Sequence, residues 1–413
     1  MKRKVIWIFN QYSGSKYHGM NYRSYYLGYE FVKKGYDVYI FAASFNHLFF
    51  KFPKTSTMFT KEIIDAMSYM WVKIRPYSGS KSFGRLWSMI SYCIKLFFVP
   101  FLKISRPDAI IVSSISPFPI IPAALFKLIY RVPLIFEVRD IWPLSLKELG
   151  GYSSCNPFIV LLQCVENFAY RVSDATVSLL PYAFDHMKYH GLKQSKFHYI
   201  PNGISEDEIP ESELIKSSFE GIPKDAFIVG YTGTIGIANA MSFFIESANL
   251  CSNFKNIYFV IVGNGDDESA LKVVASNPNI LFFDAVSKSD VFSVISSCSI
   301  MYHGCLNKRI YGYGLSPNKI FDYMVCKKPI VHAVSTRHNI VKDADCGVWV
   351  PSENPQLLAD AILHMSTLDT KDLARMGKNG YNYVLKYHSY AYLSAKYYDL
   401  LQSLFHKKSK NIF

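Results

Sequence analysis

The chain contains 413 residues, 50% of them hydrophobic, and it carries a formal net charge of +13. This length exceeds one ordinary hydrophobic core and suits two domains of about 200 residues each, while the apolar fraction excludes a disordered chain. The basic charge predicts an anionic partner, and because the sequence holds no zinc-finger, RNP or recognition-helix pattern we expect no nucleic acid.

Strands and helices are predicted to alternate through the first half of the chain. Gly14 and Gly19 fall in the loop after the first strand, and the following helix ends near Lys34. Short apolar runs predict buried strands at residues 4–9, 38–42, 108–114, 132–138 and 175–179. Continuous apolar strands separated by helices are typical of a parallel α/β sheet.

A linker is predicted at residues 200–210, IPNGISEDEIP, because two prolines, a Pro-Asn-Gly turn and an acidic run interrupt the alternation there. Helical sequence begins near Asp369 and continues to a basic tail. Between these segments the strand pattern resumes, at residues 227–232, 258–262, 280–283, 299–302 and 330–333. The second half therefore predicts a second parallel sheet.

The cellular location is predicted from cysteine and apolar patterning. None of the eight cysteines forms a CxxC pair, and the first apolar run is too short for a signal peptide, which favours a cytosolic protein. Residues 86–102 are apolar but interrupted by Lys95 and Pro100. They suit either a core helix or an interfacial helix, in which Leu96 and Phe97 enter lipid while nearby cations meet anionic headgroups.

Glycine-rich turns follow two predicted strands of the second half. Gly233 and Thr234 follow one strand, and Gly263, Asn264 and Gly265 follow the next. Such turns let backbone amides approach a phosphate, but tight strand–helix turns use glycine as well, so both interpretations stay open. Neither turn is a GxGxxG dinucleotide motif with an acidic residue about 20 positions on.

The segment GYGLSPNKIFDYMVCKKP, residues 312–329, predicts a helix with Ser316 as N-cap and Pro317 in the first helical position. The N-terminus of such a helix suits a diphosphate. Lys319 in the first turn is unfavourable for the helix dipole, which suggests a bound anion, and Asp322 suits ribose hydroxyls. An ordinary capped helix with a surface lysine and aspartate is the alternative.

The run SPNKIFDYMVCKKPIVHAV resembles the donor segment of family-4 retaining glycosyltransferases, and most closely that of fucosamine-transferase-like enzymes of bacterial O-antigen and capsule assembly. Further segments are similar to the same family over roughly residues 4–390: HGMNYR, FEVRDIWP, IPNG and VGNGDDESALK. The resemblance implies the GT-B fold, an α/β architecture in which two Rossmann-like domains with parallel sheets face each other across a cleft.

With this fold, we expect an acceptor-binding domain at residues 1–204 and a nucleotide-sugar-binding domain at residues 205–385. Residues 386–413 are expected to form a helix that crosses back to the first domain and ends in the basic tail. The family implies no metal ion and no other cofactor. Gly314 stands where the family has its first donor-site glutamate, and Asp322 stands at the second.

The resemblance also implies the functional residues. Arg139 and Asp140 are expected to be catalytic, and His18, Gly19 and Arg23 to lie on the acceptor and phosphate side. Many family members carry a basic pair where this chain has Ile237-Ala238-Asn239, so the charge must come from elsewhere. Donor-binding residues are expected at Gly233, Thr234, Gly263, Asn264, Gly265, Lys308, Arg309, Gly314, Leu315, Ser316, Pro317, Asn318, Lys319 and Asp322.

We therefore expect a retaining glycosyltransferase at the cytoplasmic face of the inner membrane. It would move an N-acetylated deoxyhexosamine or related hexose from a UDP-sugar to a polyprenyl-diphosphate-linked acceptor in bacterial surface polysaccharide synthesis. Its partners would be the nucleotide-sugar, the lipid-linked sugar and an anionic membrane. Two alternatives are a nucleotide-sugar 2-epimerase and a non-catalytic membrane scaffold of the same pathway.

Overall fold

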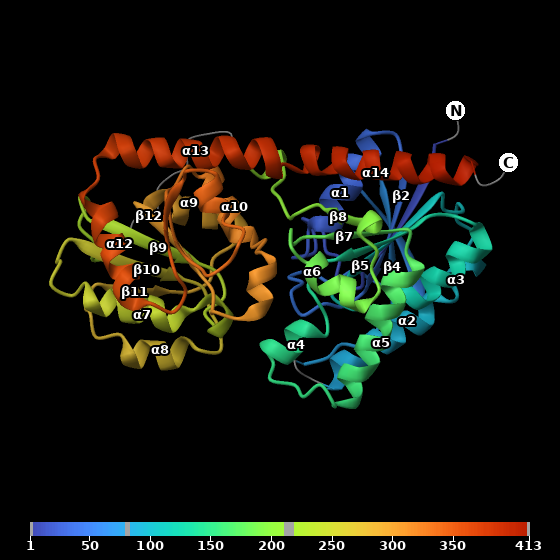
Figure 1. The fold of residues 1–413 in the computed structure, drawn as a ribbon, viewed down its shortest axis with the longest axis horizontal. Helices are drawn as coiled ribbons and strands as arrows, with labels where there is room; N and C mark the ends of the chain where they lie inside the picture. Colours follow the sequence, from blue (N-terminus) through green and yellow to red (C-terminus); the bar gives the residue numbers. More distant parts are fainter. Residues whose placement is uncertain (1–2, 79–82, 210–218, 411–413) are drawn as a thin grey trace. The chain divides into compact units, whose positions relative to one another are not determined.

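The computed structural model describes residues 3–78, 83–209 and 219–410, which form two compact units (Figure 1). Unit 1 comprises Met1–Pro201 and Tyr390–Phe413, and unit 2 comprises Asn202–Ser389. The predicted boundaries, 204 and 385, differ from these by three and four residues. Pro210 of the predicted linker and the last three residues of the chain lie outside the described residues.

Unit 1 is built on an eight-stranded sheet in the order β3-β4-β2-β1-β5-β6-β7-β8. All neighbouring strands are parallel except β3 and β4. Every residue of β1 is buried, as expected where helices cover both faces of a sheet. The strands are β1 (Val5–Phe9), β2 (Asp37–Ala43), β3 (Phe59–Ile64), β4 (Met67–Val72), β5 (Ala109–Ser114), β6 (Leu134–Val138), β7 (Ala175–Ser178) and β8 (Phe197–Tyr199).

The hairpin of β3 and β4 was not predicted from the sequence. Its two-residue turn is Asp65-Ala66, and both residues have a positive φ, 46° and 65°. Turns of this kind usually carry Asn-Gly or Asp-Gly, because glycine adopts positive φ without strain. Alanine in that place removes the sequence signal on which a hairpin prediction depends.

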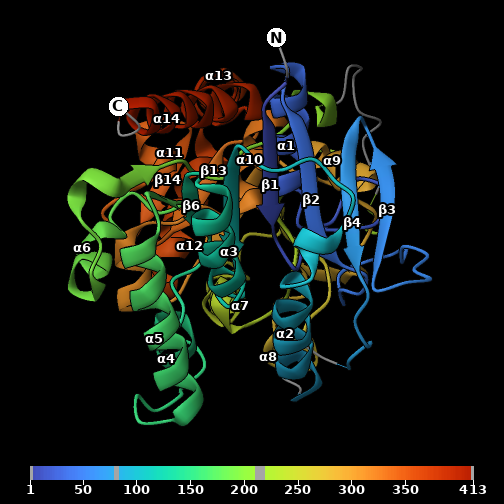
Figure 2. The same ribbon diagram turned by 90° about the vertical axis from the view of Figure 1, so that its right-hand side faces the viewer.

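The helices of unit 1 form two layers. Helices α2, α3 and α5 lie side by side on one face, and α1 packs against α14 on the other (Figure 2). The helices are α1 (Arg23–Lys33), α2 (Phe83–Leu96), α3 (Ile120–Tyr130), α4 (Leu144–Glu148), α5 (Pro157–Val172), α6 (Phe184–Met187) and α14 (Tyr390–Lys410), and the 3-10 helices are η1 (Val99–Phe101), η2 (Lys188–His190) and η3 (Gln194–Lys196).

A buried ion pair joins α1 to the sheet and to α14. Arg23 Nε donates to Glu137 Oε2 at 2.9 Å, and the two side chains are 1% and 2% exposed. Arg23 also donates to the carbonyls of Ile200 and Pro201, and Tyr397 of α14 donates to Glu137. Burial is the largest single effect and would raise the pKa of Glu137, but the Arg23 guanidinium, together with the hydrogen bonds from Tyr397 and Ser113, lowers that pKa below its usual value.

This arrangement corrects the expected role of Arg23. The sequence placed Arg23 on a loop with its guanidinium facing a phosphate, whereas the structure makes it the first residue of α1 and commits its donors to a carboxylate and two carbonyls. A guanidinium held in this way stabilises the unit instead of receiving a ligand.

Unit 2 contains a parallel six-stranded sheet in the order β11-β10-β9-β12-β13-β14. The first three strands in sequence run outward from β9, and the next three run outward from β12 in the opposite direction, which is the Rossmann order. The strands are β9 (Phe227–Thr232), β10 (Ile257–Val262), β11 (Ile280–Phe283), β12 (Ile300–Gly304), β13 (Ile330–Ala333) and β14 (Gly347–Val350). Only the four-residue β14 was missing from the sequence prediction.

Helices cover both faces of this second sheet, and α13 precedes the return of the chain to unit 1 at α14 (Figure 1). They are α7 (Met241–Leu250), α8 (Glu268–Val274), α9 (Lys288–Ser297), α10 (Asn318–Val325), α11 (Ile340–Asp343), α12 (Pro355–Thr367) and α13 (Thr370–His388), with the 3-10 helices η4 (Glu206–Glu208), η5 (Ile237–Asn239) and η6 (Arg309–Tyr313). Within the described residues, no helix combines the length and apolar character that crossing a bilayer requires.

The Arg23→Met variant tests the buried ion pair. It keeps the aliphatic stem but leaves the Glu137 charge buried without its cation, so we expect the free energy of unfolding to fall by about 3–5 kcal/mol. Urea unfolding followed by circular dichroism measures this loss. Arg3→Met is the matched control, since the contact of Arg3 with Asp37 is exposed and worth about 0–1 kcal/mol. Equal losses in both variants would contradict the assignment.

Candidate functional site

The candidate site of unit 2 lies at the carboxyl ends of β9 and β12. These neighbouring strands connect onward to opposite sides of the sheet, and ligands of open parallel sheets bind at such a switch point. Three segments come together there: the turn after β9, the turn after β10 and the start of α10. A Cβ on Gly233 would lie 3.0 Å from Lys319 Nζ, and a Cβ on Gly263 would lie 1.9 Å from Gly233 O.

The glycines after β10 serve to pack two turns together. A Cβ on Gly265 would lie 1.9 Å from Ile235 O, and Ile235 N donates to Asn264 O at 2.9 Å. Any larger residue at position 263 or 265 would therefore push the two turns apart. Gly263 and Gly265 are therefore needed for tight packing of the turns, which was one of the two interpretations that the sequence left open. This packing does not prevent their backbone amides from also meeting a ligand.

Lys319 is the half-buried cation of the site. Its Nζ donates to Tyr231 Oη at 2.8 Å and to Asn239 Oδ1 at 2.9 Å, and it lies 4.3 Å from the centre of the Tyr231 ring. Burial lowers the pKa of Lys319 to about 7, because only the more distant charge of Asp322 opposes desolvation. A bound anion would supply the charge partner that this ammonium lacks among the described residues.

This contact also answers a question raised by the sequence. The family's basic pair is absent at residues 237–239, yet Asn239 of that turn holds the ammonium of Lys319, which comes from α10. A cation thus reaches the turn after β9 from a position 80 residues further along the chain. The sequence identified Lys319 but could not show where its side chain points.

Asp322 lies one turn along α10, with its side chain 13% exposed. Lys288 at the start of α9 donates to Asp322 Oδ1 at 2.6 Å. Burial raises the pKa of Asp322, although Lys288 and Lys319 both act to lower it. Lys288 was missed at the sequence level, because no spacing pattern connects it to the donor segment.

The start of α10 differs from the prediction by one residue. Ser316 is not the N-cap: the helix begins at Asn318, Pro317 occupies the cap position, and no side chain caps the first turn. Ser316 Oγ instead accepts from Asn202 N at 2.9 Å, and Asn202 Nδ2 donates to Ser316 O at 3.0 Å. The IPNG segment therefore fixes the loop before α10, and the first amides of the helix are left without a side-chain cap.

Gly314 stands at the position of the family's first donor-site glutamate, just before this loop. Gly314 ends η6 with φ +117°, a conformation that side chains rarely adopt, so a glutamate there would be strained. Leu315 is half-buried, whereas Lys308 and Arg309 at the start of η6 are exposed. Among the described residues, neither cation forms an ion pair or hydrogen bond with Asp322.

Two histidines next to this site were missed at the sequence level. His303 of β12 and His332 of β13 pair in register, with ring centroids 5.0 Å apart, and both are buried. His303 Nδ1 and His332 Nε2 lack hydrogen-bond partners among the described residues, and burial lowers the pKa of His332 to about 4. Both rings are therefore neutral at pH 7, near the carboxyl ends of their strands. Histidine is rare in buried apolar strands, so its presence in two of them was the sequence signal that could have identified this pair.

In unit 1, Arg139 and Asp140 follow β6. Arg139 Nη2 donates to Asn21 Oδ1 at 3.1 Å, while its buried Nε and Nη1 have no partner within the described part of the chain. Ser145 Oγ donates to Asp140 Oδ1 at 2.5 Å, and burial raises the pKa of Asp140. Two unpaired guanidinium nitrogens beside a held carboxylate suit an anionic or hydroxyl-rich ligand.

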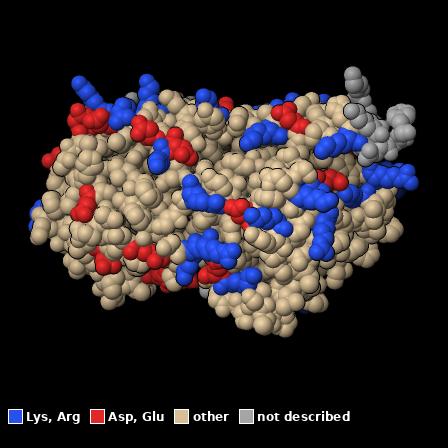
Figure 3. Space-filling view, in the orientation of Figure 1, with Lys and Arg blue, Asp and Glu red and all other residues tan. Residues whose placement is uncertain are grey.

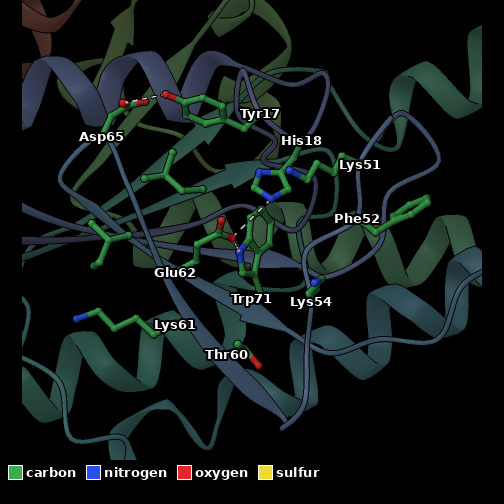
Figure 4. A pocket seen from close by; sticks show the side chains of 12 residues that line it. Tyr17, His18, Lys51, Phe52, Lys54, Thr60, Lys61, Glu62, Asp65 and Trp71 are labelled. Atoms are coloured by element: carbon green, nitrogen blue, oxygen red, sulfur yellow. Dashed lines mark hydrogen bonds and ion pairs between the residues drawn. The ribbon is translucent and has the colours of Figure 1, made fainter.

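His18 lies at a different edge of unit 1, where it helps to line a cavity of about 590 Å³ (Figure 4), and Gly19 follows it in the same loop. His18 Nε2 lies 3.6 Å from Glu62 Oε2, which also accepts from Trp71 Nε1 at 2.6 Å. Burial lowers the pKa of His18 despite the nearby Glu62. The cavity is lined by the loops after β1 and β2 and by the β3–β4 hairpin, and its lining includes Lys51, Lys54 and Lys61.

Gly19 serves the backbone of that loop. Its φ is +139°, and a Cβ would lie 2.6 Å from Leu48 O. The structure thus separates the residues assigned to the acceptor side: His18 lines the cavity with Gly19 next to it in the chain, whereas Arg23 is buried at the start of α1. The sequence could not predict this separation because it gave no β3–β4 hairpin.

Comparison with known proteins agrees with this geometry. Residues 17–208 match the model described as Glycosyltransferase Family 4, and residues 226–367 match Glycosyl transferases group 1. No curated protein sequence matches the chain.

Solved structures resemble the whole chain at low sequence identity. Sucrose-phosphate synthase from Thermosynechococcus elongatus has a TM-score of 0.74 at 13% identity, over 98% of this chain and 100% of that one. HepE from Anabaena has a TM-score of 0.63 at 14% identity, over 97% and 100%. WaaG, a glycosyltransferase involved in lipopolysaccharide biosynthesis, has a TM-score of 0.64 at 13% identity, over 96% and 99%.

The protein is therefore a glycosyltransferase of the GT-B fold, and the predicted α/β class with two Rossmann-like domains is confirmed. Within that class, the two matched regions support a family-4 enzyme. One region lies in each half of the chain.

A glycine pair in the turn after β9 offers a matched test of the site. Gly233 has φ +128°, so Gly233→Ala is strained and crowds Lys319; we expect about 1–2 kcal/mol of lost stability. Gly236 is extended, and a Cβ there would meet no atom closer than 4.0 Å, so Gly236→Ala should change stability by less than about 0.5 kcal/mol. Urea unfolding compares them, and a reversed order would contradict the described turn.

Proposed function

We propose that this glycosyltransferase takes a sugar from a UDP-sugar and transfers it, with retention at the anomeric carbon, to a polyprenyl-diphosphate-linked acceptor in bacterial surface polysaccharide synthesis. The sugar is an N-acetylated deoxyhexosamine or a related hexose. Support for the donor comes from the structural resemblance to HepE, whose structures contain UDP with glucose and UDP-glucose. Support for the pathway comes from the resemblance to WaaG and from the segment similar to fucosamine-transferase-like enzymes.

The observation that carries the proposal is the desolvated Lys319 at the switch point. In this reaction the bond from the anomeric carbon to the diphosphate breaks, and negative charge develops on the leaving diphosphate. The half-buried ammonium of Lys319 and the uncapped amides of α10 would meet that charge as it forms, and groups fixed in place beforehand stabilise a transition state most. The proposed transfer relies on these groups and requires no metal ion or other cofactor.

The neighbouring residues suit the rest of the donor. The carboxylate of Asp322, held by Lys288, would accept hydrogen bonds from the ribose hydroxyls. The amides around Gly314 and Leu315 would face the sugar, since no carboxylate stands at position 314. Arg139 and Asp140 would contact the transferred sugar or the acceptor, because the guanidinium offers two unpaired donors.

An anionic lipid acceptor agrees with the charge and surface of unit 1. Lysine and arginine side chains gather over unit 1 in Figure 3, whereas acidic side chains are denser over unit 2. The cavity beside His18 adds three lysines that would meet a diphosphate. Helices α2 and α3, with the turn after α2, also expose large apolar side chains: Phe83, Trp87, Ile94, Phe98, Phe101, Leu125, Leu128 and Ile129.

These exposed side chains revise the expected membrane contact. Leu96 is fully buried in the core and cannot enter lipid, whereas Phe101 is 81% exposed and Leu128 is 72% exposed. Helix α2 thus combines both interpretations of residues 86–102, with one face in the core and one face outside. We propose that the outer face of α2 and α3 rests on the cytoplasmic side of the inner membrane.

Transfer assays with Lys319 variants test the donor site. Wild-type protein, supplied with a panel of UDP- and GDP-sugars and a lipid-linked acceptor, should give a retained glycosidic product. Lys319→Met should lower kcat by about 100-fold or more, because one charge-stabilising donor is lost. Lys371→Met should retain nearly full activity, since Lys371 is an exposed lysine at the start of α13 and was not assigned to either site. Nucleotide binding without any transfer would favour the scaffold alternative.

The pKa of Lys319 also predicts a pH dependence of UDP binding. In the unliganded protein the pKa of Lys319 is about 7, and a bound diphosphate would raise it. The contribution of Lys319 to UDP affinity is therefore complete below pH 7 and is lost as pH rises above 7. We expect the Kd for UDP to rise about tenfold between pH 7 and 9. Lys319→Arg stays charged, so its Kd should be flat over this range. Isothermal titration calorimetry distinguishes the profiles, and identical slopes would contradict the assignment.

Vesicle binding tests the proposed membrane contact. Replacing Phe101 and Leu128 by glutamate places two charges on the exposed apolar face, and we expect at least tenfold weaker binding to anionic vesicles, given about 0.8 kcal/mol per buried CH₂. Val273→Glu in unit 2 is the matched control, because Val273 is also highly exposed. Unchanged flotation of the double variant would exclude this face as the contact.

A further inference from the structure

A cluster of metal-ligating side chains lies in unit 1 where α6 and η2 pack against α5. His186 and His190 are four residues apart on one side of this helical segment, and Glu166 faces them from α5. Glu166 and His186 are buried, whereas His190 is half-exposed. One ligand atom from each of the three residues lies within 4.8 Å of the other two.

The spacing is close to that of a tetrahedral metal site. His186 Nε2 lies 3.2 Å from Glu166 Oε1, and ligands at about 2.0–2.1 Å from a tetrahedral zinc ion stand about 3.3 Å apart. The two imidazole rings have centroids 4.3 Å apart. Since His190 is at the surface and the other two residues are fixed in the core, a rotation of the His190 side chain would bring the third ligand into range.

The hydrogen bonds around His190 do not balance. Gln163 Nε2 lies 2.5 Å from Glu166 Oε2, 2.8 Å from His190 Nδ1 and 3.0 Å from Asn167 Oδ1, yet an amide nitrogen has only two hydrogens for these three acceptors. His190 Nδ1 is also 3.1 Å from Asn167 Oδ1. If His190 Nδ1 carries a proton, that proton faces the N–H donor of Gln163. If Nδ1 carries no proton, its lone pair faces the oxygen of Asn167.

A metal ion on His190 Nδ1 removes this mismatch. The Nδ1 lone pair then binds the ion, and the two hydrogens of Gln163 serve Glu166 and Asn167. Tyr170 donates to Glu166 Oε1 at 2.8 Å, which holds the carboxylate in place as an outer hydrogen bond commonly does for a metal ligand. The surroundings of the cluster are thus compatible with a bound cation.

From this geometry we infer that Glu166, His186 and His190 bind a structural zinc ion that fixes α6 and η2 to α5. Two imidazoles at i and i+4 with one carboxylate form a ligand set that zinc prefers, and water completes the tetrahedron. Magnesium and calcium require oxygen ligands and do not suit two imidazoles. The ion has no part in sugar transfer as proposed above.

The test uses the full-length protein with Cys155 and Cys164 replaced by serine, since both thiols are exposed and would bind zinc themselves. After chelator treatment and dialysis, we expect one zinc ion per chain by mass spectrometry and titration calorimetry, and a higher thermal midpoint with zinc but not with magnesium. His190→Ala should weaken zinc binding by at least about 100-fold, and Tyr170→Phe by about tenfold.

His47→Ala is the matched control, because His47 is an exposed histidine of the same unit outside the cluster. Zinc binding that survives in His190→Ala and Glu166→Gln, or a folded wild-type protein that binds no zinc at micromolar concentration, would overturn the inference and leave the cluster as a hydrogen-bond network. Should Glu166→Gln fail to fold, His190→Ala decides alone, because its half-exposed side chain can be removed without opening the core.

Discussion

The pairing of Arg23 with Glu137 is the constraint on which unit 1 depends. It joins the start of α1, strand β6, the chain at Ile200 and Pro201 and, through Tyr397, the C-terminal helix. A buried charge without its partner is costly, so these four segments must assemble together. The carboxylate also sits two residues before Arg139, at the end of the same strand. The interaction that holds the unit together therefore fixes the backbone that presents the candidate catalytic residues.

The candidate sites of unit 1 and unit 2 share one feature, a cation that is held by neutral oxygens. Lys319 in unit 2 and Arg139 in unit 1 are both half-buried, and within the described residues neither forms an ion pair. Each is held by neutral oxygens, those of Tyr231 and Asn239 for the lysine and of Asn21 for the arginine. Because no carboxylate is bonded to it, each side chain can pair with an incoming diphosphate or sugar-linked anion, and that anion would favour the charged form of Lys319.

The unusual donor segment follows from the same geometry. Position 314 requires a positive φ, which excludes the family's first glutamate, and the missing cation at residues 237–239 is replaced by Lys319 reaching that turn from α10. The clamp between Asn202 and Ser316 places the loop so that the first amides of α10 stay uncapped. These departures from the family pattern are therefore connected, because both concern the charged groups around the start of α10.

The sequence by itself determined the alternation of strands and helices, the two-domain α/β class and the segments carrying Arg139, Lys319 and Asp322, since hydrophobic period and local turn chemistry are written in neighbouring residues. It did not determine the β3–β4 hairpin, whose Asp65-Ala66 turn lacks glycine, or the burial of Arg23 and Leu96. Only the tertiary structure decided that Lys288 meets Asp322, that Asn202 meets Ser316 and that Glu166 faces two histidines. Those contacts join residues between 20 and 114 positions apart, and local sequence pattern carries no information about which distant side chain will arrive.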